Sequence, residues 1–254
     1  MLTGDAPRVT VAVPSLQQAA FLGEALDSLL SQDVPLEVFV ADAGSTDGSV
    51  DVIRAREAHL AGWRSHPDVG QAAAINECIG RGRAPYVCWL NSDDLLLPGA
   101  LHTLCAALDA APLAPAVYGL AWNQSPAGAR TPVRVESFDP RRLALRCIVS
   151  QPATLVRRSA WEAVGGLDEA LQMAMDYDLW WRLYLHGGSL LHVPEYAAVN
   201  REHAGTKTRR FRARHYREAI EVVRRHHGSV PAKWWLYQPW AVWAKSVRAA
   251  WHRQ

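Results

Sequence analysis

Residues 86–94 read Tyr-Val-Cys-Trp-Leu-Asn-Ser-Asp-Asp, an apolar run that stops abruptly at two adjacent carboxylates. The apolar part is typical of a buried strand. Asp93 and Asp94 then lie at its carboxyl end, where open α/β sheets place their ligand crevice. Adjacent carboxylates repel each other unless a positive charge shares the site, and a divalent cation with oxygen ligands is the usual solution. The alternative is that Asp94 only caps a helix over about residues 98–108 while Asp93 is solvated.

Upstream of this stretch, strand-like and helix-like patterns alternate. Residues 9–13 form a short apolar strand, and the apolar positions between residues 21 and 30 follow helical spacing. The expected order continues as strand, helix, brief strand and helix at residues 36–41, 49–60, 63–65 and 71–80. This alternation predicts an α/β fold with a parallel sheet and crossover helices.

The composition allows one large α/β domain, or one domain plus a tail, because the chain has 254 residues of which 49% are hydrophobic. The net charge of +2 conceals an asymmetry. Residues 1–200 hold 14 Lys+Arg against 22 Asp+Glu, or −8, whereas residues 201–254 hold 13 against 3, or +10. The basic tail also holds five of the eleven tryptophans, which makes it a different sort of segment.

The cysteines and the apolar runs indicate the compartment. The four cysteines are scattered and form no CxxC pair: Cys78, Cys88, Cys105 and Cys147. We interpret them as reduced core residues. No signal peptide opens the chain, and no run of 18 apolar residues would span a membrane. The sequence therefore predicts a cytoplasmic protein.

Four blocks carry a resemblance to a known family. They read Val-Ala-Val-Pro-Ser at 11–15, Ala-Asp-Ala-Gly-Ser-Thr-Asp-Gly at 41–48, Asp-Val-Gly-Gln-Ala-Ala-Ala-Ile-Asn at 68–76 and Asn-Ser-Asp-Asp at 91–94. In this order and at these separations they resemble family 2 glycosyltransferases of the GT-A fold. Residues 151–154, 165–168 and 175–180 resemble the second half of the same family.

The resemblance implies a Rossmann-like α/β/α sandwich with a mixed central sheet. Residues 1–208 would form the GT-A domain, with a nucleotide-sugar-binding half at 1–98 and an acceptor and catalytic half at 99–208. Residues 209–254 would form a basic, Trp-rich helical extension.

The resemblance also places the donor site. The residues that would bind the donor nucleotide are Pro14, Ser15, Asp42, Asp68, Gly70, Gln71, Asn76, Asn91 and Ser92. Asp42 would accept a hydrogen bond from the base, and Asp93 would hold Mg²⁺ or Mn²⁺ on the donor diphosphate. From the residues alone, Asp42 and Asp47 can also be ordinary turn carboxylates, and Asn76 can be an exposed helix residue.

The sequence departs from the family pattern at three places. Asn91 stands where the family's Asp-x-Asp element begins, so it brings no charge to the metal, and Asp94 is the acid that would compensate. Leu16-Gln17 stands where a Tyr-Asn pair is common. Met175 stands where a Glu usually precedes the catalytic Asp.

A helix is expected over residues 175–186, and Asp176 lies in its first turn. One face of this helix, at i, i+3, i+4 and i+7 spacing, carries Asp176, Leu179, Trp180 and Leu183. Partial burial would raise the pKa of Asp176, and the helix N-terminus would lower it. The resemblance makes Asp176 the catalytic base; the alternative is an acid that only complements the helix dipole. Asp178 has a simpler explanation as the i, i+4 partner of Arg182.

Residues 201–208, Arg-Glu-His-Ala-Gly-Thr-Lys-Thr, resemble a flexible segment of the family. There the resemblance implies that His203 completes the metal site or contacts the diphosphate. Arg201 or Lys207 would pair with phosphate oxygens. The alternative is that His203 is structural or solvated.

The tail is expected to be helical and basic. Five arginines charge one helix that continues to about residue 225: Arg209, Arg210, Arg212, Arg214 and Arg217. Further on, an apolar stripe is formed by Leu236, Trp240, Trp243, Val247 and Trp251. Residues 231–254 therefore have the composition of an interfacial helix on an anionic membrane surface, which would make the protein peripheral. The alternative is packing on the catalytic domain or on a second subunit in a homodimer; no motif supports nucleic acid binding.

The resemblance implies inverting, metal-dependent transfer of a sugar from a UDP-, dTDP- or GDP-sugar donor to a hydroxyl acceptor. Asp176 would take the acceptor proton, Asp93 would hold the metal at the leaving diphosphate, and the pocket would align the reactants. The resemblance implies a glycan or lipid-linked acceptor in surface polysaccharide or glycolipid synthesis. One alternative is a nucleotide-sugar-binding protein without catalysis, suggested by Asn91 and Met175. Another is a sugar nucleotidyltransferase, and paired-carboxylate glycoside hydrolysis leaves the nucleotide-pocket blocks unexplained.

Overall fold

In the computed structural model, which describes residues 6–203 and 205–238, the first half of the chain builds the parallel part of one large sheet. Its strands are β1 (Val9–Ser15), β2 (Leu36–Asp42), β3 (Gly62–Ser65) and β4 (Tyr86–Trp89). They lie in the order β3-β2-β1-β4, and all three pairs are parallel. β1 is buried along its whole length, and its apolar run is typical of a strand covered on both faces.

The second half of the chain extends the sheet and makes it mixed. It contributes β5 (Leu95–Leu96), β6 (Ala116–Gln124), β7 (Arg130–Pro132), β8 (Thr154–Arg157) and β9 (Leu191–Arg201). β8 is antiparallel to both β4 and β6, β9 is parallel to β6, and β5 is antiparallel to β9. Across the described residues the order is β3-β2-β1-β4-β8-β6-β9-β5, with β7 beside β6. The predicted mixed central sheet is confirmed.

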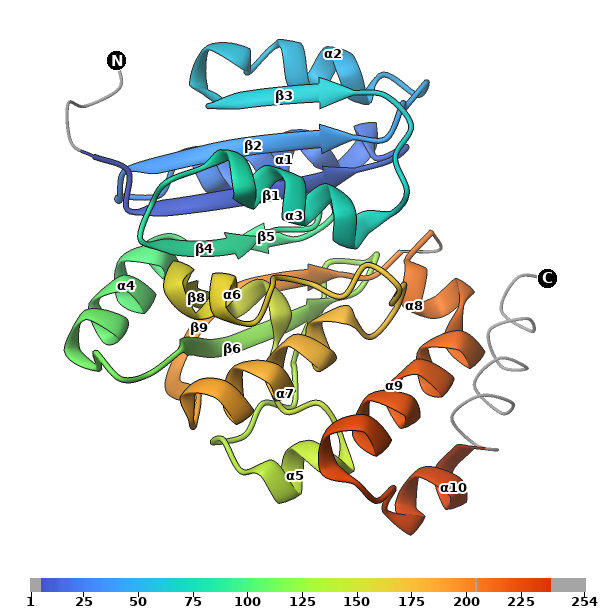
Figure 1. The fold of residues 1–254 in the computed structure, drawn as a ribbon. Coiled ribbons are helices and arrows are strands. Elements are labelled where there is room, and N and C mark those ends of the chain that lie inside the picture. Colours follow the sequence, from blue (N-terminus) through green and yellow to red (C-terminus); the bar gives the residue numbers. More distant parts are fainter. Residues whose placement is uncertain (1–5, 204, 239–254) are drawn as a thin grey trace.

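Helices cover both faces of this sheet, as Figure 1 shows. One core holds the apolar sides of α1 (Ala19–Leu30), α2 (Ser49–Arg54) and α4 (Ala100–Ala110). The opposite core holds those of α3 (Gln71–Arg81), α5 (Pro140–Leu145), α6 (Arg158–Ala163) and α7 (Met175–Gly187). Alternate residues of β1 enter the two cores, Val11 and Val13 the first and Ala12 the second. The α/β/α sandwich that the sequence predicts is therefore present.

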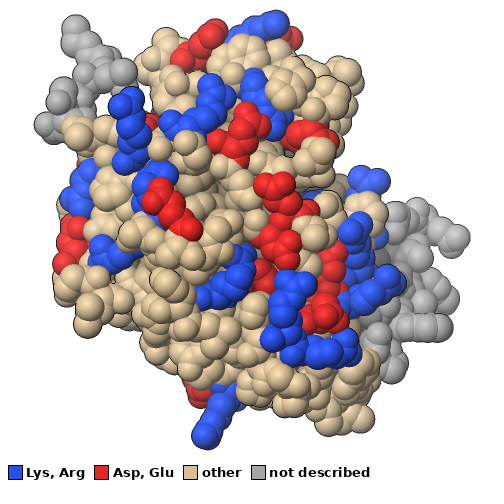
Figure 2. Space-filling model, in the orientation of Figure 1, with Lys and Arg blue, Asp and Glu red and all other residues tan. Residues whose placement is uncertain are grey.

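The C-terminal helices pack on the second core. α8 (Lys207–Arg210) leads into α9 (Arg212–His227), which buries Ala219, Ile220, Val222 and Val223 in the same core as α7. α10 (Ala232–Gln238) buries Trp234, whose Nε1 donates to the carbonyl oxygen of Ala144 at 2.7 Å. Basic and acidic side chains lie side by side over this part of the surface (Figure 2). The helical extension thus packs against the core that holds α5 and α7 at least as far as Trp234.

Three helix boundaries differ from the prediction. The helix expected over residues 49–60 ends at Arg54, and a 3₁₀ turn follows at Glu57–His59. α4 starts at Ala100 rather than at residue 98, because Gly99 adopts a left-handed conformation (φ +72°) at its N-cap. The basic helix expected from residue 209 is divided at Phe211 into α8 and α9.

The predicted membrane-facing stripe is only partly described. Leu236 is 76% exposed, whereas Trp240, Trp243, Val247 and Trp251 lie outside the described residues. No helix in the part of the chain that the structure describes is both long and apolar enough to cross a membrane.

Candidate active site

The carboxyl ends of β1, β2 and β3 form one edge of the sheet. Ser15 lies opposite Asp42 in the register of β1 and β2, and Asp42 lies opposite Ser65 in that of β2 and β3. β4 lies on the other side of β1, so the strand order reverses between β1 and β4. Open α/β sheets hold their ligands outside the carboxyl ends of the strands at such a switch point. Residues 91–94, which follow β4, therefore lie at this switch point.

Asp42 is fully buried at the end of β2. Its carboxylate accepts hydrogen bonds from the backbone N–H groups of Gly44 and Ser45 and from the hydroxyls of Ser45 and Ser65, at 2.5–3.1 Å. Burial alone would raise the pKa of Asp42, but these hydrogen bonds hold it below its usual value. The ionised carboxylate orders the loop after β2, and its contact with a nucleotide base stays a prediction.

Asp47 is a turn carboxylate, which is the alternative that the sequence left open for it. Its carboxylate accepts from the backbone N–H of Ala19 at 2.9 Å and from the hydroxyl of Ser49 at 2.6 Å. It therefore holds the starts of α1 and α2 together beside the crevice.

Three further predicted nucleotide contacts, Pro14, Ser15 and Ser92, are buried at the ends of β1 and β4. The hydroxyl of Ser15 is buried and has no hydrogen-bond partner among the described residues. A buried hydroxyl without a partner costs free energy, so a ligand group that hydrogen-bonds Ser15 would remove that cost.

The turn before α3 brings Asp68 and Gly70 toward the same edge. Asp68 accepts from the N–H of Gly70 at 3.0 Å and pairs with Arg64 at 3.2 Å. Arg64 also donates to the carbonyl oxygen of Asp42 at 3.0 Å. Gly70 has φ +138°, and a Cβ there would lie 3.2 Å from the amide nitrogen of Gln172. The turn therefore requires glycine and lies against the segment that precedes α7.

A chain of amide hydrogen bonds joins α3 to the loop after β4. Gln71 donates to Asn91 Oδ1 at 2.8 Å. The Nδ2 of Asn91 donates to Asp94 at 3.0 Å and to Gln151 at 3.1 Å, and Gln151 donates to the carbonyl oxygen of Trp89 at 2.8 Å. An aspartate at position 91 would lack these donors. Asn91 therefore organises the loop through an amide that the family's usual acid does not have.

Asp93 and His203 meet at this loop. The Nε2 of His203 lies 2.9 Å from Asp93 Oδ2, and the His203 ring stacks on Phe21 of α1 at 4.4 Å between centroids. The N–H of Gly205 donates to His203 Nδ1 at 3.2 Å, so a neutral imidazole carries its proton on Nε2, facing Asp93. The interpretation of Asp93 as a solvated acid is wrong, because its side chain is only 18% exposed and is paired.

Asp94 is buried behind this pair. Its carboxylate accepts from Asn91 and from the backbone N–H of Arg201 at 3.3 Å. Burial, followed by the charge of Asp93, raises the pKa of Asp94 to about 7. Asp94 caps no helix, because the N-cap of α4 is Gly99. The capping alternative is therefore wrong.

Arg201 is committed to protein contacts. Its guanidinium donates to the carbonyl oxygens of Asp93 and Phe21 and pairs with Glu24, and the residue is 8% exposed. These contacts attach the end of β9 to α1 and to the acid-bearing loop. They account for Arg201 without a phosphate, so its predicted diphosphate contact has no geometric support.

Lys207 connects the two halves of the chain. Its Nζ donates to Gln71 Oε1 at 2.9 Å and to the carbonyl oxygen of Gln172 at 3.1 Å. Enclosure by protein lowers the pKa of Lys207. The ammonium group lies beside the Gln71–Asn91 contact, and its pairing with phosphate stays a prediction.

Asp176 lies in the first turn of α7 and is half-buried. The residues expected on its stripe, Leu179, Trp180 and Leu183, are fully buried, which confirms the predicted inward face. Its carboxylate accepts from the N–H of Tyr177 at 2.8 Å. Burial raises the pKa of Asp176, although the Tyr177 hydrogen bond and the nearby His215 of α9 oppose part of the rise. A half-buried carboxylate with a raised pKa is suited to accept a proton.

Asp178 lies two residues after Asp176 in α7 and belongs to an ionic cluster. It pairs with Arg182 at 2.7 Å, as predicted, and with His226 of α9 at 2.7 Å. Asp178 is fully buried, and burial alone would raise its pKa, yet His226 and Arg182 hold the pKa below its usual value. Asp178 therefore attaches α7 to α9 and has no free oxygen for an acceptor.

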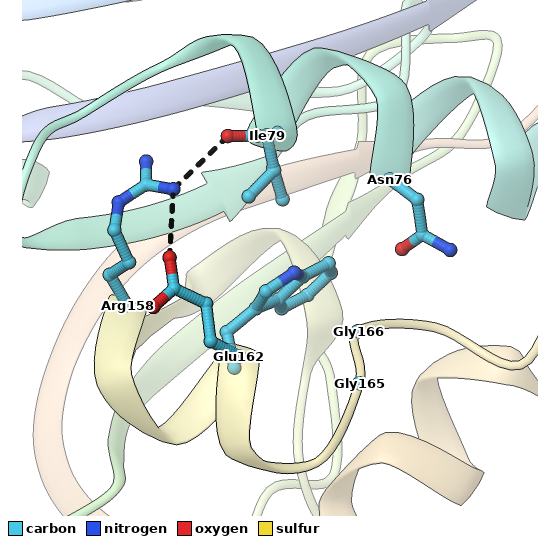
Figure 3. Close-up of a pocket in the computed structure, with 8 residues that line it drawn as sticks. Asn76, Ile79, Arg158, Glu162, Gly165 and Gly166 are labelled. Atoms are coloured by element: carbon cyan, nitrogen blue, oxygen red, sulfur yellow. Dashed lines mark hydrogen bonds and ion pairs between the residues drawn. The ribbon is translucent and has the colours of Figure 1, made fainter.

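Asn76 lies in a shallow hollow between α3 and α6 (Figure 3). Its amide exchanges hydrogen bonds with the backbone of Leu167, at 3.0 and 2.9 Å, and donates to Glu169 at 2.9 Å. Arg158 in the same hollow donates to the carbonyl oxygen of Ile79 and pairs with a neighbouring glutamate. Asn76 thus holds the loop before α7 against α3, and these contacts do not support its predicted role in the nucleotide pocket.

The residues present fit a metal shared with a diphosphate. Asp93 and His203 lie together at the crevice, while no group of three or more His, Cys, Asp or Glu side chains suited to a metal occurs in the described part of the chain. Mg²⁺ is commonly bound through one or two protein ligands plus substrate phosphates. Two protein ligands at the switch point would therefore be enough for such an ion if a diphosphate supplied the others.

Sequence reasoning missed the residues that connect the predicted ones. Gln151 orients Asn91, and Gln172 receives Lys207 and lies against Gly70. Glu218 of α9 accepts three backbone N–H groups directly before α7. The one signal for Glu218 in the sequence was that it is one of only 3 acidic residues in the basic segment 201–254.

The fold is of the α/β class with a mixed sheet, and comparison with known proteins gives the family. The model described as Glycosyl transferase family 2 matches residues 10–160. The chain belongs to this family. The match extends from β1 into α6 and includes Asp42 and Asp93.

Characterised relatives share part of their length with this chain. Chondroitin synthase of Pasteurella multocida is 28% identical over 182 residues, which cover 70% of this chain and 19% of that protein. The succinoglycan biosynthesis protein ExoU of Rhizobium meliloti is 31% identical over 221 residues, covering 79% of this chain and 64% of that protein. The chain thus matches about a fifth of the first relative.

Solved structures show the fold class. S. aureus TarS 1–349 in complex with UDP-GlcNAc has a TM-score of 0.70 and 18% identity, covering 86% of this chain and 66% of that one. The mannosyltransferase PcManGT from Pyrobaculum calidifontis, in complex with GDP-Man and Mn²⁺, has a TM-score of 0.67 and 22% identity, covering 99% of this chain and 77% of that one. Both are GT-A glycosyltransferases, and the predicted GT-A fold is confirmed.

Proposed function

We propose that the chain catalyses inverting, metal-dependent transfer of a sugar from a nucleotide-sugar donor to a hydroxyl acceptor. The observation that carries the proposal is the meeting of Asp93 and His203 at the switch point of the sheet. From Asn91, in the same loop as Asp93, hydrogen bonds lead through Gln71 and Lys207 to Gln172, four residues before Asp176. The proposed metal ligands and the proposed base therefore belong to one connected structure.

Each group has a chemical role in this reaction. The loop ordered by Asp42 and the buried hydroxyl of Ser15 would contact the nucleoside. Asp93 and His203 would hold Mg²⁺ or Mn²⁺, which would supply charge stabilisation for the leaving diphosphate. Asp176 would accept the proton of the attacking hydroxyl. The contacts of Lys207 and Gln172 would keep the donor crevice and α7 in register, since reacting groups must be aligned to within about an ångström.

The relatives support the substrate class. TarS and PcManGT are described with UDP-GlcNAc and with GDP-Man and Mn²⁺, so a nucleotide-sugar donor and a divalent metal are the natural proposals here. Chondroitin synthase and the succinoglycan biosynthesis protein support a glycan or lipid-linked acceptor in polysaccharide synthesis. The excess of 13 Lys+Arg over 3 Asp+Glu in residues 201–254 would suit a cytoplasmic protein that works at an anionic membrane.

A donor panel tests the proposal directly. The chain is incubated with UDP-, dTDP- and GDP-sugars, with Mn²⁺ or with a chelator, and the released phosphate species are measured. Slow metal-dependent release of a nucleoside diphosphate supports the transferase, because such donors are commonly hydrolysed when the acceptor is missing. Release of pyrophosphate indicates a nucleotidyltransferase instead. Metal-dependent binding without turnover on any glycan acceptor indicates a binding protein that has lost catalysis.

A further inference from the structure

We infer that Glu218 of α9 is a positioning residue for the proposed base, because its carboxylate holds the three residues that lead into the first turn of α7. The inference rests on the proposed function for the role of Asp176. It assigns to the C-terminal extension a part in the catalytic centre, although residues 10–160 are the ones that match the family model.

The geometry is a carboxylate that accepts consecutive backbone N–H groups. One oxygen of Glu218 accepts from Gln172 at 3.0 Å, from Met173 at 2.7 Å and from Ala174 at 3.1 Å. The other oxygen accepts from Arg214 at 2.8 Å. The Glu218 side chain is 12% exposed. Burial alone would raise the pKa of Glu218, but these hydrogen bonds hold it below its usual value, so the group is ionised at neutral pH.

The segment needs such a partner because its own sequence supplies none. The N-cap of α7 is Ala174, which has no side chain to accept a hydrogen bond. N–H groups at a helix start lack partners within the helix, and negative charge is favourable there. Glu218 accepts the N–H groups of the N-cap residue and of the two residues before it, so a carboxylate from a different helix fixes the approach to α7, and Asp176 follows two residues after the N-cap.

The same segment also contacts the donor half. Gln172 lies against Gly70, and its carbonyl oxygen accepts from Lys207, which in turn donates to Gln71. Fixing residues 172–174 therefore sets the distance from Asp176 to the donor crevice as well as the direction of α7. If the segment were free, donor binding would persist while the base lost its place.

Other charged and titratable groups face Asp176 and are left unchanged by a substitution at Glu218. His215, one turn earlier on α9, and Cys147 from the loop before β8 both interact with the Asp176 charge. Glu218 itself interacts with His215 and Lys207.

A matched pair of substitutions tests the inference. Glu218→Gln removes the charge but keeps the size. Glu221→Gln is the control on the same helix, because Glu221 is half-exposed and pairs with Arg224 alone among the described residues. Both variants are compared with the parent and with Asp176→Asn for turnover at saturating donor, for calorimetric affinity toward the nucleoside diphosphate with Mn²⁺, and for amide hydrogen exchange of residues 172–176.

We expect Glu218→Gln to lower kcat roughly 10–100-fold, the scale on which displacement by about an ångström reduces rates. Nucleoside diphosphate affinity should stay within about twofold, amide exchange of residues 172–174 should accelerate, and Glu221→Gln should match the parent in all three measurements. Glu218→Asp, which keeps the charge on a shorter stem, should recover part of the rate.

Parental kcat in Glu218→Gln, or unchanged exchange of residues 172–174, overturns the inference. An equal fall in kcat and in diphosphate affinity also overturns it, because that pattern indicates general loss of structure. Parental turnover in Asp176→Asn instead refutes the proposed base. If no donor is turned over, amide exchange still decides whether Glu218 holds the segment.

Discussion

The carboxylate of Asp93 and the imidazole of His203 lie 2.9 Å apart, although 110 positions separate them in the chain. The contact joins the loop after β4 to the segment after β9. A neutral His203 has its proton on the nitrogen that faces Asp93, because the N–H of Gly205 occupies Nδ1. Binding of a metal through Nε2 would shift that proton to Nδ1 and break the Gly205 contact. Metal affinity should therefore be coupled to the conformation of this segment.

The first prediction concerns Asp93. Asp93→Ala should abolish the increase in nucleoside diphosphate affinity that Mn²⁺ causes, because His203 alone is a weak site. Titration calorimetry with and without Mn²⁺ measures the difference. The control is Asp51→Ala, since Asp51 is 81% exposed and its contact with Arg54 is a surface pair at 3.4 Å. A variant that binds diphosphate as tightly as the parent in Mn²⁺ would show that Asp93 is no metal ligand.

The second prediction concerns Ser15. Ser15→Ala removes a buried hydroxyl that has no partner among the described residues, so the free energy of unfolding should stay the same or rise by up to about 1 kcal/mol. Affinity for the nucleoside diphosphate should nevertheless fall if the hydroxyl contacts the donor. Thermal unfolding and calorimetry on the same samples separate the two effects.

Ser28→Ala provides the contrast for that experiment. The Ser28 hydroxyl donates to the carbonyl oxygen of Ala25 at 2.7 Å and accepts from the N–H of Leu96 at 3.2 Å. This variant should lose stability and keep its affinity. If Ser15→Ala also loses stability and keeps affinity, the hydroxyl is a structural group and the donor contact is refuted.

Much of the fold could be predicted from local patterns. The apolar run before Asn91, the strand ends at Ser15 and Asp42, and the inward stripe of α7 all depend on short-range spacing, and each is found as predicted. Spacing of two or of 3.6 residues fixes which side chains share a face, and parallel strands place their carboxyl ends together. Asp42 at the carboxyl end of β2 and Asp93 just after β4 agree with the predicted strand ends for this reason.

Long-range side-chain partners could not be predicted. Asn76 contacts Leu167, Arg201 contacts Phe21 and Asp93, and Glu218 contacts residues more than 40 positions away. No periodicity encodes such pairs, because they depend on how elements pack in three dimensions. Asn91 illustrates the limit. From the sequence, it only lacks the negative charge that an aspartate would bring to the metal, whereas in the structure its amide donates to Asp94 and Gln151.

The third prediction concerns Asp178. Asp178→Asn should lower the free energy of unfolding by about 3 kcal/mol at pH 7, because a buried ion-pair partner is removed and Arg182 and His226 remain. The pKa of Asp178 is held below its usual value, so its stabilisation is present at neutral pH and is lost as pH falls through the folded-state pKa. The stabilities of parent and variant, measured by urea unfolding, should therefore converge as pH falls below the ordinary carboxylate range. Equal stabilities at pH 7 would contradict the importance of the cluster.

The fourth prediction separates the two roles of the tail. Truncation after Gln238 should reduce sedimentation with anionic vesicles and leave the thermal midpoint near that of the parent. Truncation after Val230 should lower the thermal midpoint, because it also removes Trp234, which is buried and hydrogen-bonded to Ala144 and Tyr216. If the chain truncated after Gln238 sediments with vesicles as well as the parent does, the membrane role of residues 239–254 is refuted.

The last prediction concerns Asp176. Asp176→Asn keeps the size of the side chain but cannot accept a proton at neutral pH, so transfer should fall roughly 10²–10⁴-fold while donor affinity persists. Because burial raises the pKa of Asp176, the parent rate should rise with pH above the ordinary carboxylate range and then level off.

The raised pKa of Asp176 also lowers the stability of the protein at neutral pH. A carboxyl whose folded-state pKa is raised stabilises the protein most at low pH, and that contribution is lost as pH rises through the folded-state pKa. Asp176→Asn should therefore unfold at an equal or higher temperature than the parent at pH 7, and a variant that transfers sugar at the parental rate would refute the assignment of Asp176 as the base.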